Sequence, residues 1–145
     1  MNLDSSIRAL YQAETDLTQH LRTLAADHAG QPEIHHVARD LAAWSARHAD
    51  TLRQRYGLDP RPEAGPVAAI RAAFTGGLLD DLRALHLAAT AVSLDWELLG
   101  QGAQAAKDTE LLALTKHCHP ETLRQNRWAN AMLKTLSPQI LASQS

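Results

Sequence analysis

The chain has 145 residues, of which 45% are hydrophobic and only 4% aromatic, so we expect one domain with an aliphatic core and not a multidomain enzyme. A net charge of −2 lacks the basic excess that a nucleic-acid partner requires, and the single cysteine, Cys118, cannot close an internal disulfide. Acidic residues stand where a signal peptide needs a basic start, and no run of about 18 apolar residues occurs. We therefore expect a cytoplasmic protein with no membrane partner. Its eight histidines are the main reason to look for a site.

Two long helices are predicted in the first part of the chain. Over residues 3–29, apolar side chains recur every three or four positions, which is the pattern of a helix with one buried face. The same spacing continues over residues 32–56, where Pro32 suits the first helical turn. Because the link between them is short, we expect the second helix to fold back antiparallel on the first.

Residues 57–77 are predicted to be a crossover connection. They contain three of the six prolines and four of the seven glycines, so they cannot form one regular helix. About twenty residues are enough to carry the chain along a whole bundle, and a short helix is expected over residues 67–74. The long helices on either side of the crossover would then run in the same direction.

Two further long helices are predicted, over residues 78–106 and 108–136. Asp108 has the character of a helix cap, and both segments again show apolar positions every three or four residues. Pro120 lies inside the last helix, where a proline removes a backbone hydrogen bond, so we expect this helix to kink or split there. We expect the helix to end at Ser137-Pro138.

The four long helices predict an all-α, up-down-down-up bundle that forms one domain over residues 1–145. Counting residues from the end of the bundle where the first two helices meet places one polar side chain of each helix at the same height. These are Glu14, His48, Asp95 and Glu121. Glu14, His48 and Glu121 lie on the apolar seams of their helices, whereas Asp95 is one residue away from its seam.

A charged group in an aliphatic seam must be paired or must bind something, because burying it alone is costly. Carboxylates with an imidazole are a suitable ligand set for iron, manganese or zinc. The alternative is a buried hydrogen-bonded network in which His48 pairs with Glu14 or Glu121. Trp96 favours the network, since its indole would fill the space that a metal pair needs. Asp95 and Trp96 cannot both face the centre.

At this point the chain resembles the ferritin-like superfamily over nearly its whole length. The resemblance implies metal ligands in the order Glu, Glu-x-x-His, Glu and Glu-x-x-His on the four helices. Glu14 matches the first element and His48 the histidine of the second. Asp95 or Glu97 matches the third, and Glu121 begins the fourth.

The ligand pattern of the superfamily is present only in part. Ser45 stands where the second element has its Glu, and Arg124 stands where the fourth has its His. His117, one turn before Glu121, would be a substitute ligand. The C-terminal run from Trp128 to Leu141 is similar to the ending of short bacterial ferritin-like proteins of unassigned function, and this likeness implies no activity.

Two functions from different classes follow. The first is a non-catalytic ferritin-like module for binding or assembly, whose partner is another copy or a different protein. The second is a metal-dependent oxidoreductase or metal store that uses Glu14, His48, Asp95 and Glu121. We also expect a homo-oligomer, because Gly100 and Gly102 allow close packing of helices and the tail offers exposed apolar residues. The sequence identifies no catalytic residue.

Overall fold

A computed structural model describes residues 1–143 of the chain. Within this range the protein is all-helical and contains no strand, which confirms the predicted class. The helices are α1 (Leu3–Asp27), α2 (Pro32–Tyr56), α3 (Pro66–Ala73), α4 (Leu78–Ala105) and α5 (Thr109–Ser143). None of the helices in the described part of the chain is long and apolar enough to cross a membrane.

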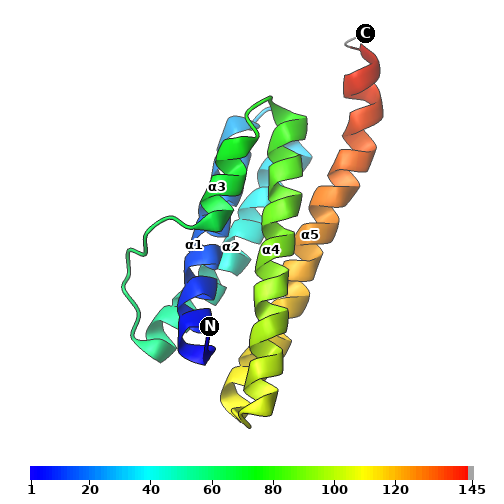
Figure 1. Ribbon diagram of the computed structural model, residues 1–145. Coiled ribbons are helices and arrows are strands. Elements are labelled where there is room, and N and C mark those ends of the chain that lie inside the picture. The colour runs from blue at the N-terminus through cyan, green and yellow to red at the C-terminus, as the bar shows by residue number, and fades with distance from the viewer. Residues whose placement is uncertain (144–145) are drawn as a thin grey trace.

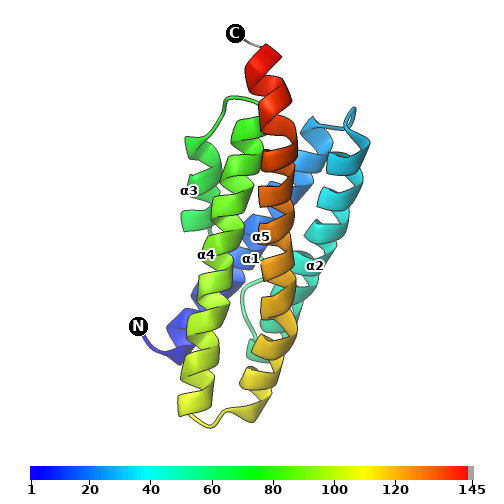
Figure 2. The ribbon, with the colours of Figure 1, turned by 90° about the vertical axis from the view of Figure 1, so that its right-hand side faces the viewer.

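The four long helices lie side by side, and α3 covers one side near the top of the view (Figure 1). Helix α1 rises, α2 returns, and the crossover carries the chain upward again, so that α4 descends and α5 rises (Figures 1 and 2). Helix α1 packs closely on α2, and α4 packs closely on α5, whereas α2 and α5 touch only slightly. The two helix pairs are held together mainly through α1 and α4.

Local sequence explains where the helices begin and end. Asn2 caps α1 by accepting a hydrogen bond from the backbone of Ser5 at 2.9 Å, and the Ser5 hydroxyl accepts one in return. Helix α2 starts at Pro32 and ends at Gly57, which adopts a left-handed conformation. As predicted, Asp108 caps α5, since its carboxylate accepts a hydrogen bond from the backbone of Leu111 at 3.1 Å.

The crossover is held against α1 by polar contacts to its backbone. The Tyr11 hydroxyl donates to the carbonyl of Asp59 at 2.6 Å, and the Asp16 carboxylate accepts from the backbone of Gly65 at 2.8 Å. These bonds satisfy backbone groups of a segment that has few of its own. The expected short helix is present as α3, one residue earlier than predicted.

The last helix extends beyond its predicted end. Helix α5 is continuous through Pro120, so of the two predicted alternatives the split does not occur, and the helix continues through Pro138 to Ser143. Pro120 is exposed, so the carbonyl that loses its hydrogen bond lies on the solvent side of the helix, where water can take the place of the missing donor. The apolar tail is therefore the last turn of α5, with Leu141 63% exposed, and not a segment beyond the helix.

The two glycines of α4 serve contacts within the chain. A Cβ atom on Gly100 would lie 2.8 Å from the Thr115 side chain of α5, and one on Gly102 would lie 2.8 Å from the Leu3 side chain of α1. These close approaches account for both glycines. They therefore no longer support the predicted oligomer, whose surface must be sought elsewhere.

Candidate functional site

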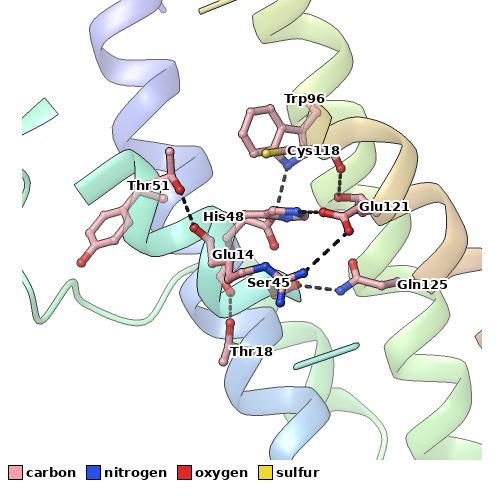
Figure 3. Close-up of polar contacts among 12 residues, drawn as sticks. Glu14, Thr18, Ser45, His48, Thr51, Trp96, Cys118, Glu121 and Gln125 are labelled. Carbon is pink, nitrogen blue, oxygen red and sulfur yellow. Dashed lines mark hydrogen bonds and ion pairs between the residues drawn. The ribbon is translucent and has the colours of Figure 1, made fainter. Parts of the chain in front are cut away.

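A chain of buried polar groups crosses the middle of the bundle, with His48 of α2 at its centre (Figure 3). Nδ1 of His48 lies 2.6 Å from Oε2 of Glu14 on α1, and Nε2 lies 2.8 Å from Oε1 of Glu121 on α5. Trp96 of α4 donates its indole N–H to the same Glu14 oxygen at 2.9 Å. All four long helices thus contribute to one network, which we call the polar layer: Glu14, His48, Trp96 and Glu121.

The polar layer is largely closed to solvent. Glu14 is fully buried, His48 is 2% exposed, and the Glu121 side chain is 17% exposed. This confirms the prediction that the three seam residues lie together and that His48 bonds to at least one carboxylate. It bonds to both.

The surroundings of His48 favour the positively charged form of its ring. Burial alone would lower its pKa, but the Cys118 sulfur and the Glu14 carboxylate outweigh burial and raise the pKa of His48 to about 11. Both ring nitrogens then carry hydrogens at neutral pH, and each donates to one carboxylate. The geometry and the charge agree, because a neutral ring would have only one N–H to donate.

Trp96, and not Asp95, faces the centre of the bundle. Trp96 is completely buried, and its ring meets the His48 ring edge-on with the centroids 6.0 Å apart. Asp95 is only partly buried. Its burial and the nearby Glu14 charge raise the pKa of Asp95 to about 6. Asp95 therefore interacts with the polar layer through its charge and makes no hydrogen bond to it.

Three further residues belong to the site, of which Arg47 and Gln125 were not singled out from the sequence and Ser45 was noted only for standing in place of a Glu. Nη2 of Arg47 lies 3.8 Å from Oε2 of Glu121, which places a second cation on that carboxylate. Gln125 donates from Nε2 to the Ser45 hydroxyl at 2.9 Å, and also to the carbonyl of Leu41. Ser45 therefore has a partner on α5. The one sequence signal for the pair of Ser45 and Gln125 is that Ser45 stands where the Glu-x-x-His pattern of the second helix has its Glu.

An open groove of about 710 Å³ separates α2 from α5 beside the polar layer. His48, Cys118 and Glu121 lie along it, and His117 lines it on the α5 side. His117 is exposed, whereas His119 points the other way and lies 3.1 Å from the Ser93 hydroxyl of α4. The two histidines cannot share an ion, as their positions on one helix predict.

The polar layer is a poor fit to a shared metal ion. Glu14 and Glu121 occupy opposite nitrogens of the His48 ring, so they cannot converge with it on one cation unless the ring moves. Trp96 fills the space beside Glu14, and Arg47 stands beside Glu121. Among the described residues, no group of three or more His, Cys, Asp or Glu side chains is arranged to hold a metal ion. The assignment of Glu14, His48, Asp95, Glu121 and His117 as ligands stays a prediction.

Comparison of the chain with protein-family models, with curated proteins and with solved structures gives no significant match.

Proposed function

We propose that the chain is a ferritin-like four-helix bundle that acts as a non-catalytic module for binding or assembly. The observation that carries the proposal is the engagement of both ring nitrogens of His48 by carboxylates. A site built for metal or acid-base chemistry keeps a ligand position or a titrating group free for its substrate. In the polar layer the imidazole has no free nitrogen.

The ferritin-like part of the proposal is supported by the helix order, the long crossover and the partial ligand pattern. In this interpretation the polar layer is what remains of a metal site whose second Glu has become Ser45 and whose second His has become Arg124. The positive charge of His48 takes the place of the metal charge between Glu14 and Glu121. The layer then holds the four helices in register and leaves the outer faces for partners.

One observation favours the alternative, a metal-dependent oxidoreductase or metal store with iron, manganese or zinc. Oε1 of Glu14 is buried and has no hydrogen-bond partner, and the partly buried Asp95 carboxylate lies near enough to interact with Glu14. Such a pair of oxygens is a chemically reasonable start for a cation site. This pair of oxygens still lacks a third ligand, because both ring nitrogens of His48 are already bonded to Glu14 and Glu121.

Metal analysis of untagged protein separates the two functions. We expect less than stoichiometric iron, manganese or zinc after purification, and no change in melting temperature on adding Fe²⁺, Mn²⁺ or Zn²⁺ beyond that seen with the variant Glu14→Gln. The control Glu110→Gln removes an exposed carboxylate of the groove without touching the polar layer. One bound metal per chain that is retained by Glu110→Gln and lost by Glu14→Gln would overturn the proposal.

A further inference from the structure

The outer side of the α4 and α5 pair carries an apolar stripe that nothing in the described part of the chain covers. Figure 2 looks onto this side, with α4 and α5 in front of the other helices. Three exposed leucines of α4 follow a spacing of seven and four residues, and Leu123 of α5 is exposed beside them. Their exposures are 41% for Leu87, 58% for Leu94, 58% for Leu98 and 38% for Leu123. We call these four residues the leucine face.

Hydrogen bonds between α4 and α5 fix the heights of these residues. Ser93 contacts His119, and Thr90 accepts a hydrogen bond from the side chain of Asn126. Leu123 lies between His119 and Asn126 on α5, so it is level with Ala91 of α4, about one helical turn from Leu94. By the same register, Glu97 of α4 and Lys116 of α5 lie level with each other at the lower end of the face.

The whole outer side of the α4 and α5 pair, which contains the leucine face, is large enough for a stable homodimer. A 28-residue helix such as α4 is about 40 Å long, and two packed helices are roughly 20 Å wide. The resulting area is close to the ~800 Å² that each partner buries in an interface of standard size. Isolated exposed leucines are ordinary on a protein surface, whereas exposed apolar side chains that gather on one face are typical of an interaction site.

Charge decides how two copies would meet. Lys116 and Arg127 share the outer side of α5 with Leu123, and neither has an ion-pair partner among the described residues. If the two-fold axis ran across the helices, α5 would lie on the α5 of the other copy and Lys116 would face Arg127. If the axis runs along the helices, α4 lies on the other α5, and Glu97 faces Lys116. The Glu97 carboxylate, which also lies 3.7 Å from Nδ1 of His119 in its own chain, would then meet a second cation. Opposite charges favour the second arrangement.

We propose that a second copy of this chain binds the leucine face, related by a two-fold axis parallel to the helices, so that α4 of each copy packs on α5 of the other. The inference rests on the proposed assembly function and names its partner. Leu94 and Leu123 form the centre of the interface, and Glu97 pairs with Lys116 of the other copy at one end.

Sedimentation equilibrium of the full chain tests the dimer. We expect twice the 15.8 kDa of one chain at micromolar concentration, and at least a tenfold weaker dimer for Leu94→Glu. The matched control is Leu141→Glu, which changes a similarly exposed leucine about 27 Å along α5 from Leu123, beyond the level at which α4 begins, and should leave the dimer intact. Wild-type protein at the mass of one chain, or an equal loss of dimer in both variants, would overturn the proposal. Neither result bears on the metal content that tests the proposed function.

Charge reversal tests the direction of the axis. Lys116→Glu should weaken the dimer, because two acidic side chains would then face each other across the interface, and adding Glu97→Lys should restore it. A dimer that becomes tighter in Lys116→Glu would contradict the arrangement, since that result is expected only if Lys116 faces Arg127. Circular dichroism of each variant shows whether it is folded, and all of the changed residues are exposed.

Discussion

His48 is the residue on which most of the polar layer depends, because it is the only donor that reaches both Glu14 and Glu121 among the described residues. We expect His48→Ala to lower the free energy of unfolding by about 3–5 kcal/mol, since it leaves a buried carboxylate unpaired and opens a cavity. His48→Leu should cost less, because leucine fills the space. Adding Glu14→Gln to His48→Leu should recover part of the loss, since glutamine is uncharged and still accepts from Trp96.

Urea denaturation monitored by circular dichroism measures these differences. His36→Leu is the control, since it changes an exposed histidine of the same helix and should alter stability by less than about 0.5 kcal/mol. If His48→Leu and His48→Leu/Glu14→Gln were equally stable, Glu14 would not carry a buried charge that depends on His48.

The pH dependence of stability follows from the raised pKa of His48. Because the folded pKa is about 11 and the ordinary value is 6.5, the stabilisation is complete below pH 6.5 and is lost as the pH rises toward 11. The pKa of Asp95 is raised from 3.8 to about 6. It therefore adds a smaller fall in the free energy of unfolding as the pH rises from 3.8 to about 6. The free energy of unfolding should therefore fall by about 1 kcal/mol per pH unit from about pH 7 to about pH 9.

Urea titrations at about pH 7, 8 and 9 measure this slope. His48→Leu should remove it while leaving any slope from other groups. A stability that stays constant over this range in the wild-type protein would mean that His48 is neutral, with only one of its two contacts a hydrogen bond.

The sequence predicted the polar layer as far as the helical seams define it. Glu14, His48 and Glu121 could be found because each interrupts an apolar repeat, and counting along the helices placed them at one height. Asp95 is next to its seam, so counting alone could not choose between it and Trp96, and the larger apolar side chain took the buried position. Arg47 is 60% exposed, and no pattern in the sequence separates it from other surface arginines.

At the scale of the helices, replacing Pro120 measures how much stability α5 loses by having a proline in its interior. Pro120→Ala should raise the free energy of unfolding by about 1 kcal/mol or more, because alanine restores an N–H in an exposed helix interior and adapts to its geometry. The control is Pro32→Ala at the first turn of α2, where the N–H has no helical partner and no gain is expected. Equal effects at the two positions would show that Pro120 causes no loss in α5.

Helix bounds could be predicted well where the sequence supplies a terminating signal. The start at Pro32 and the cap at Asp108 were found because proline at a first turn and a side-chain acceptor act locally. The end of α5 could not be found, because Ser137-Pro138 looks like a terminator and the helix continues past it. A proline ends a helix only where the carbonyl that loses its backbone hydrogen bond finds no other partner, such as water. Pro138 is exposed, in the C-terminal part of α5 that extends above the other helices (Figure 1).

For the molecule as a whole, the small contact between α2 and α5 predicts which helix unfolds locally first. Helix α2 packs closely only on α1. Its polar links to α5 are the bonds of His48 to Glu121 and of Gln125 to Ser45 and Leu41, together with the ion pair of Arg47 and Glu121. Regions with few buried apolar contacts open at lower free energy than the core. We therefore expect backbone amides of α2 to exchange with solvent by a partial opening, before those of α1 and α4.

Glu121→Gln tests this opening directly, because it removes the charge opposite His48 without creating a cavity. In native-state hydrogen exchange, we expect it to speed exchange throughout α2 by about tenfold or more and to leave the slowest amides of α4 nearly unchanged. Glu110→Gln, on the same helix at the rim of the groove, should change neither. If Glu121→Gln sped exchange in α2 and α4 by the same factor, opening would be global, and the contact between α2 and α5 would be as strong as the rest of the bundle. Selective exchange in α2 would instead show that the charge of His48 closes the weak side of the bundle.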